Sequence, residues 1–185
     1  MDICLKTGYS GKDASDLFTN KELLAFYFAL PYLQFEPELC FIAEVENKIA
    51  GYIIGTSNTK EFAAWMNDVW LPPLRERYKV NGNYKTDFER WVVKLINEGY
   101  KLSKFADEYP AHLHIDILPF GQGKGIGKKL INIFMDKLNP LNVSGVHLEV
   151  GKKNTNAIGF YEKMGFTRLA DYENSIVFGK KLSNV

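Results

Sequence analysis

Four glycines fall within seven residues, Gly121, Gly123, Gly125 and Gly127, and offer a place where an anion could bind. They separate a strand pattern from a helix pattern, so the first N–H groups of the helix would have neither an intrahelical partner nor side chains covering them. These donors and the positive end of the helix dipole favour a phosphate or pyrophosphate, and Lys124 adds charge. A plain tight turn is the competing interpretation, because glycine serves many turns.

Two familiar phosphate loops fit this glycine run poorly. The P-loop requires Ser or Thr after its Gly-Lys pair, whereas Gly127 is followed by Lys128-Lys129. A dinucleotide-binding loop would stand early in a βαβ unit, with an acidic residue about 20 positions further on. Neither context is present, so the sequence favours neither class.

Residues that could move protons fall on two predicted strands. His112, His114 and Asp116 alternate along one strand, and His147 and Glu149 alternate along the other, so each set shares a polar face. Structural histidines are the ordinary interpretation, with Asp116 or His114 available as a base. No metal site is predicted, because strand neighbours two apart do not by themselves converge on an ion such as zinc.

A strand and a helix would hold the glycine run in place. Leu113, Ile115 and Ile117 alternate with polar residues, as in a strand that Pro119 ends. From Ile126 to Leu138, apolar residues recur every four positions as one buried stripe of a helix. The predicted order is therefore strand, anion loop, helix.

The pattern Gln-x-x-Gly-x-Gly, which starts at Gln122 and follows a strand ending in proline, resembles motif A of the GCN5-related N-acetyltransferase (GNAT) family. The segment from Asn154 to Phe166 resembles motif B of that family, and the two motifs stand in the family's order. The resemblance extends loosely from Ile3 to Leu182 but leaves out Ser57 to Tyr109. It implies an acetyl-CoA-dependent transferase whose glycine loop holds the cofactor pyrophosphate.

The resemblance also implies which residues bind acetyl-CoA. Backbone groups of Ile115 and Ile117 would bind the pantetheine arm like an added strand, and Asn154 would cap a helix and contact the same arm. The implied cofactor-binding set is Ile115, Ile117, Gln122, Gly123, Lys124, Gly125, Ile126, Gly127 and Asn154.

The catalytic roles follow from the resemblance and from proton chemistry. Deprotonating an alkylammonium with a pKa near 10.4 costs roughly 4.6 kcal/mol at pH 7, so a base matters more than an acid for a thiol with a pKa near 8.5. Leu148-Glu149-Val150 is similar to the segment of ribosomal-protein alanine acetyltransferases in which Glu is the base, and Tyr161 matches their general acid. A solvated or helix-paired carboxylate is the alternative for Glu149, and Asp116 is a further candidate base.

The expected fold class is α/β, a GNAT fold with a mixed twisted sheet of about seven strands, helices on both faces and a helical insertion before the fourth strand. One domain should span residues 1–185. The predicted strands are Ile3 to Tyr9, Cys40 to Val45, Ile49 to Thr56, His112 to Ile117, Gly145 to Val150, Phe166 to Tyr172 and Ser175 to Leu182.

The insertion, about residues 60–108, should contain two helices. One would end at Leu71-Pro72-Pro73, and the other would open with a capping box from Thr86 to Glu89. The part from Phe62 to Tyr78 resembles the acetyltransferase-like domain of O-GlcNAc hydrolases. Its aromatic rings would either pack inward or form a rim for the acceptor: Trp65, Trp70, Trp91, Tyr78 and Tyr84. Leu23 to Leu33, a predicted short helix and irregular segment, is either core or one wall of the acceptor cleft.

Composition limits the partners. The net charge of +1 gives no general attraction to nucleic acid or anionic lipid. No apolar run is long enough for a membrane span, and the first residues begin no signal peptide, so a cytoplasmic protein is expected. Cys4 and Cys40, on predicted strands, are expected to be reduced thiols.

The function expected from these patterns is transfer of an acetyl group from acetyl-CoA to a primary amine, on a small molecule or a protein. The alternative is a non-catalytic acyl-CoA-binding or protein-interaction module with the same fold. A third possibility is O-acylation or a longer acyl donor. The sequence names no acceptor and fixes no oligomeric state, and a homodimer is compatible with it.

Overall fold

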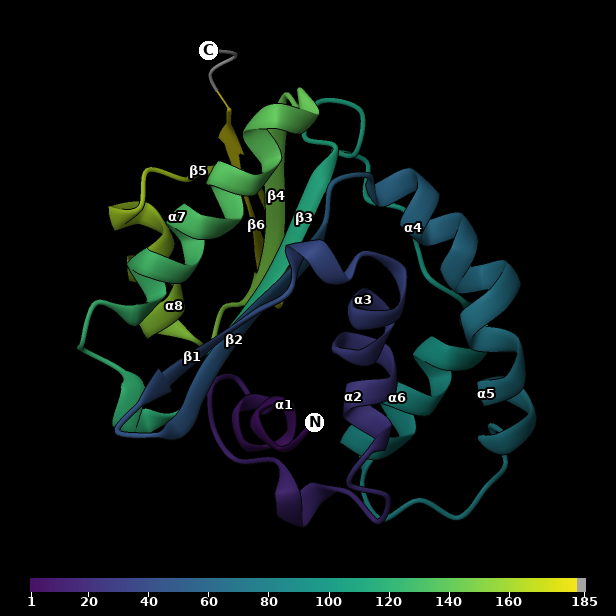
Figure 1. The fold of residues 1–185 in the computed structure, drawn as a ribbon. Coiled ribbons are helices and arrows are strands. Elements are labelled where there is room, and N and C mark those ends of the chain that lie inside the picture. The colour runs from purple at the N-terminus through teal and green to yellow at the C-terminus, as the bar shows by residue number, and fades with distance from the viewer. Residues whose placement is uncertain (183–185) are drawn as a thin grey trace.

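The computed structural model describes residues 1–182, and within them six strands form one mixed sheet in the order β1-β2-β3-β4-β6-β5 (Figure 1). β3 and β4 run parallel, whereas every other neighbouring pair is antiparallel. The strands are β1 (Phe41–Val45), β2 (Lys48–Thr56), β3 (Ala111–Ile117), β4 (Gly145–Gly151), β5 (Thr167–Asp171) and β6 (Ser175–Lys181).

Helices cover both faces of this sheet, which confirms the predicted α/β class. α7 (Ile126–Leu138) and α8 (Thr155–Lys163) lie on one face, and α1 (Asp2–Thr7), α2 (Leu23–Phe28) and α3 (Leu30–Phe35) lie on the other (Figure 1). The predicted stripe of α7 is buried against the sheet, as its period of about four residues requires. Each face of the sheet therefore has its own apolar core.

The predicted first strand is wrong, because Ile3 begins within a helix and not a strand. Lys6 Nζ lies 2.9 Å from an Asp2 carboxylate oxygen four residues earlier, and Thr7 Oγ1 donates to Ile3 O at 2.8 Å. Three consecutive side chains, Ile3 to Leu5, are buried, which a strand with only one covered face could not achieve. The described sheet thus has six strands, and the insertion precedes its third strand.

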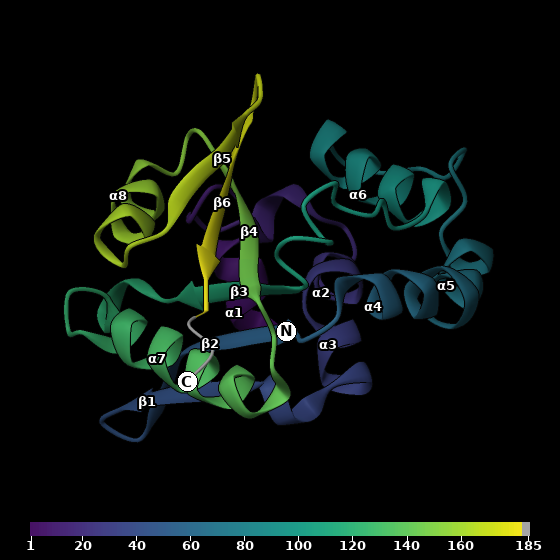
Figure 2. The same ribbon diagram turned by 90° about the horizontal axis from the view of Figure 1, so that it is seen from above.

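The insertion contains three helices with a π-helical turn, Met66–Trp70, between the first two. They are α4 (Thr59–Trp65), α5 (Leu71–Arg77) and α6 (Asp87–Glu98), and they gather beside α2 at one side of the molecule (Figure 2). The prediction that Leu71-Pro72-Pro73 ends a helix is wrong. Proline lies in the first turn of α5, where its missing N–H would have no intrahelical partner anyway.

Two smaller predictions also differ from the structure. The segment after α2 is not irregular, because the chain breaks only at Ala29 (φ −135°) and resumes as α3. Cys4 lies in α1 and Cys40 precedes β1, so neither is on a strand, although both are free cysteines. Burial raises the pKa of the Cys4 thiol to about 12, so it stays protonated at neutral pH.

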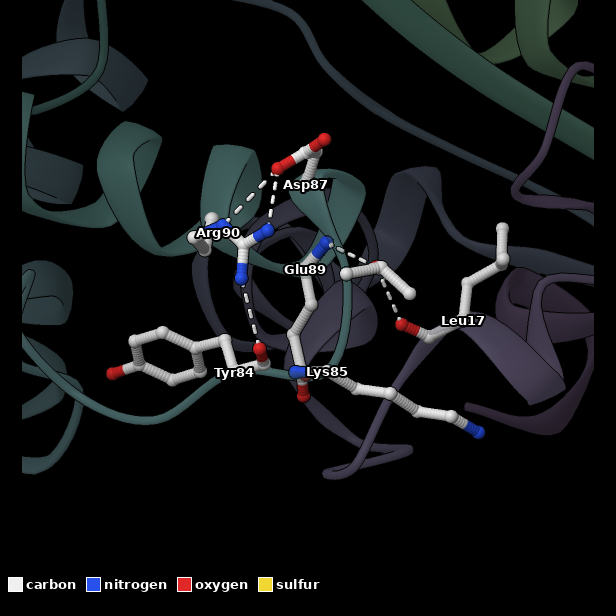
Figure 3. Close-up of polar contacts among 7 residues, drawn as sticks. Leu17, Tyr84, Lys85, Asp87, Glu89 and Arg90 are labelled. Atoms are coloured by element: carbon white, nitrogen blue, oxygen red, sulfur yellow. Dashed lines mark hydrogen bonds and ion pairs between the residues drawn. The ribbon is translucent and has the colours of Figure 1, made fainter.

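Only one of the two hydrogen bonds of the predicted capping box at Thr86 forms (Figure 3). Thr86 Oγ1 accepts from Glu89 N at 3.1 Å and donates to Leu17 O at 2.8 Å. The buried Glu89 carboxylate does not close the box but accepts three other backbone N–H groups, from Lys85 at 2.7 Å, Thr19 at 2.8 Å and Asn20 at 3.1 Å. It therefore joins the N-terminal loop to the start of α6.

No helix within residues 1–182 is both long and apolar enough to cross a bilayer.

Candidate functional site

The sheet divides between β3 and β4. Within the described residues these strands are in register only at Ala111 opposite Val146 and His112 opposite His147, while β3 stays paired with β2 as far as Ile117. Leu118 N donates to Ala50 O at 2.8 Å, so by the alternation of a strand the peptide groups of Ile115 and Ile117 point away from β2. Backbone donors and acceptors therefore line the split and could pair with an extended ligand.

The glycine loop lies at the end of β3. Gly123 and Gly125 have φ of 73° and 76°, in the left-handed region that favours glycine, and Gly125 is the N-cap of α7. A Cβ added to either residue would meet nothing within 4 Å, so open space lies directly against the backbone. Lys124 is exposed in the same turn, and Ile126 begins the helix. The loop has the form of an anion cradle.

Two further predicted cofactor residues have structural tasks as well. Gln122 Nε2 donates to Ile117 O at 2.9 Å, which ties the loop back to the end of β3. A Cβ on Gly127 would lie 3.0 Å from Phe160 Cζ, so this glycine permits close contact between α7 and α8. Asn154 caps α8 by accepting from Ala157 N at 3.2 Å, as the sequence predicts.

Tyr161, the candidate general acid, projects from α8 into aromatic surroundings. Its side chain is 6% exposed and contacts the rings of Phe166 and Phe178. Burial raises its pKa, and the Asp116 charge raises it further, so the phenol stays protonated. No hydrogen bond to the Tyr161 hydroxyl is recorded within residues 1–182, so its proton is not committed to another side chain there.

The two candidate carboxylate bases have different surroundings. Asp116 accepts a hydrogen bond from the Tyr52 hydroxyl, and burial raises its pKa while that bond lowers it. Glu149 is exposed and accepts from the Ser175 hydroxyl across the β4–β6 pair. A raised pKa makes Asp116 more basic than an ordinary aspartate, whereas Glu149 is exposed to water.

Two of the histidines belong to a buried hydrogen-bond chain that the sequence did not predict. His112 Nδ1 lies 2.8 Å from Thr59 Oγ1, and its Nε2 lies 2.8 Å from the Tyr32 hydroxyl. The same hydroxyl is 3.0 Å from Nε2 of His114, and Tyr100 approaches His112 Nε2 at 3.2 Å. Thr59, Tyr32 and Tyr100 come from separate segments, so no local pattern could have identified them.

Burial keeps these imidazoles neutral. It lowers the pKa of His112 well below its ordinary value and that of His114 to about 4. The recorded hydrogen bond of His114 uses Nε2 and leaves Nδ1 without a partner within the described residues. His147 is tied through Nδ1 to Tyr109 O at 2.7 Å. In residues 1–182 no three His, Cys, Asp or Glu side chains are grouped to hold a metal.

Two surface hollows lie away from these residues. One lies between α4 and the loop before β3, lined by Glu36, Lys60 and Asp107 among others. The second lies between β1 and α7, beside Ile42 and Ile133. Neither includes the glycine loop, Asp116, Glu149 or Tyr161.

Comparisons with known proteins agree with this geometry. A model of the "Acetyltransferase (GNAT) family" matches residues 91–166. The protein in the crystal structure of SsHAT is 32% identical in sequence to this chain. The match covers 97% of this chain and 90% of that one, with a TM-score of 0.86.

Two curated relatives are more distant. Protein O-GlcNAcase of Rattus norvegicus is 24% identical over 152 residues, which is 78% of this chain but 17% of that protein. Mycothiol acetyltransferase of Renibacterium salmoninarum is 39% identical over 54 residues, 29% of this chain and 16% of that protein. The chain thus spans about a sixth of the length of these relatives.

Proposed function

The chain belongs to the GNAT acetyltransferase family, and from this premise we propose that it transfers an acetyl group from acetyl-CoA to a primary amine by direct attack. One observation carries the proposal: the split between β3 and β4 leads directly to a loop of left-handed glycines at the start of α7. Backbone that can pair with an extended amide chain and backbone that can cradle a pyrophosphate are therefore continuous.

The residues present fit the cosubstrate. Gln122 to Gly127 would hold the pyrophosphate through backbone N–H groups, with the Lys124 ammonium adding charge. Ile115 and Ile117 would pair with the pantetheine arm, and Asn154 would contact the same arm. Acetyl-CoA supplies the thioester, whose acetyl group is activated for attack by nitrogen.

The proton steps set the tasks of the side chains. The ammonium loses one proton before its nitrogen attacks the thioester carbon, and the nitrogen loses a second after the C–N bond forms. As the C–S bond breaks, the expelled thiolate takes one proton up, and the other leaves through the base to water. Tyr161 would give its proton to the thiolate sulfur, because its raised pKa keeps the phenol protonated at neutral pH. Glu149 or Asp116, directly or through water, would accept the amine proton; assays of Glu149→Gln and Asp116→Asn decide between them by which variant moves the pH–rate profile to higher pH.

The rival function is a non-catalytic acyl-CoA-binding or protein-interaction module. The Gln122–Gly127 loop with its left-handed glycines, together with a Tyr161 phenol that stays protonated, favours catalysis over this alternative. Thiol release from acetyl-CoA, measured with a panel of small amines and of peptides with free amino groups, separates the two. Release that depends on an amine supports the transferase. Tight acetyl-CoA binding by calorimetry without release from any amine would favour the module.

A further inference from the structure

A row of aromatic rings, called here the aromatic wall, runs from the surface to His114 on the face of the sheet opposite α7. Phe88 and Trp91 of α6 stack with centroids 5.5 Å apart, and Trp91 stacks on Phe28 of α2 at 5.9 Å. Phe28 meets the His114 ring edge to face at 6.2 Å. Tyr9 extends the outer end, 5.6 Å from Phe88. The rings come from four separate segments and make one continuous wall.

The rings of this wall are partly exposed to solvent, unlike the rings of a buried core. Trp91 and Tyr9 are each 45% exposed, and Phe28, Phe88 and His114 are partly exposed. The other aromatic residues predicted to form a rim are held in the structure: Trp70 Nε1 donates to Phe26 O at 2.7 Å, and Tyr84 donates to Lys79 O at 2.7 Å. Of the five rings considered in the sequence, Trp91 is therefore the exposed one.

The inner end of the wall is suited to an amine. The Asp116 carboxylate can accept a hydrogen bond from an ammonium group, and it lies two residues beyond His114 on the same strand face. Aromatic faces also attract cations, so a protonated amine would be favoured along the whole path. Beyond His114 the wall continues through three stacked rings, Phe28, Trp91 and Phe88, which offer apolar contact to a flat group larger than one methylene chain.

We propose that Phe28, Trp91 and Phe88 form the acceptor subsite, and that the acceptor is a primary amine carried on a flat aromatic skeleton, an aryl-alkyl amine. This inference rests on the proposed acetyl transfer. Its binding component stands apart from turnover, because ring stacking and the cation attraction act before any chemistry.

The test measures binding and turnover separately. 2-Phenylethylamine and tryptamine are compared with ethylamine, by calorimetric titration of protein saturated with CoA and by thiol release. The wild-type protein should bind both aryl-alkyl amines about tenfold more tightly than ethylamine, from stacking and apolar contact. Trp91→Ala should remove most of that preference and leave acetyl-CoA affinity unchanged, and Trp91→Phe should restore part of it.

Ile42→Ala provides the matched control, because Ile42 is 62% exposed on β1 and its loss removes apolar surface elsewhere. Equal binding of aryl-alkyl and alkyl amines by the wild type, no binding of either class, or equal losses for both in Trp91→Ala would overturn the inference. Binding that depends on Trp91 without thiol release would support the subsite and refute the transferase.

Discussion

The two sides of the proposed site differ in the parts of the chain that form them. The cofactor side is made largely of backbone from one continuous stretch, β3 through the glycine loop to α7. The proposed acceptor side is made of side chains from segments far apart in the sequence, among them Tyr9, Phe28, Trp91 and His114. A site made of backbone leaves a local signature of glycines and periodicity, whereas a site made of distant side chains leaves none.

The largest effect is expected from a change that disables the cofactor side alone. Gly125→Glu should weaken acetyl-CoA binding by at least about 100-fold, because a non-glycine residue is strained by roughly 1–2 kcal/mol at φ 76° and the carboxylate repels a phosphate. Calorimetric titration with acetyl-CoA measures this loss. Gly125→Asn is the control, since asparagine tolerates the left-handed region and adds no charge, and it should retain most of the affinity. Equal affinity in Gly125→Glu would contradict an anion cradle.

Tyr161 tests whether the chemistry depends on the candidate general acid. Tyr161→Phe removes a proton donor and almost no volume, so kcat should fall about 100-fold while the Kd for acetyl-CoA stays the same. Steady-state thiol release and calorimetry give the two numbers. A fall of less than about threefold would assign protonation of the thiolate to water.

Glu89 tests the scaffold behind the acceptor side. Glu89→Ala leaves three backbone N–H groups without their acceptor and should lower the free energy of unfolding by about 2 kcal/mol. Glu89→Gln should cost less, because one oxygen can still accept from Thr19 and Asn20. Urea unfolding followed by circular dichroism measures both. Acetyl-CoA affinity should not change in either variant, and a parallel loss would mean that the two sides are coupled.

The last prediction concerns the pH dependence of stability. The pKa values of His112 and His114 are lowered in the folded protein, so below about pH 6.5 the unfolded chain binds protons that the folded chain refuses. Stability should therefore fall as the pH drops from about 6.5 toward 4, by up to about 1.4 kcal/mol per pH unit for each ring. Urea unfolding at several pH values should show a smaller slope in His114→Gln. An unchanged slope would mean that His114 is not held neutral.

The sequence predicted what short-range patterns determine. The β1–β2 hairpin, the loop and helix after β3, and the Asn154 cap of α8 all follow from periodicity, glycine spacing or capping chemistry. It failed for Ile3 to Tyr9, because an apolar stretch this short has no distinct period and its burial under the sheet decided the outcome. The Tyr32 link between His112 and His114 could not be predicted from the sequence, because tertiary contacts create it. The aromatic wall could not be predicted for the same reason.

The hydrogen bonds around His112 determine its tautomer. Thr59 Oγ1 lies 2.6 Å from Pro110 O, too close for two oxygens without a proton between them, so Thr59 donates there and His112 Nδ1 carries hydrogen. His112 Nε2 is then an acceptor, and the Tyr32 and Tyr100 hydroxyls lie 2.8 and 3.2 Å from it. Burial lowers the pKa of His112 well below its ordinary value, so the neutral ring accepts a hydrogen bond without taking up a proton. A single backbone carbonyl just before β3 thus fixes which nitrogen of a buried ring carries the hydrogen.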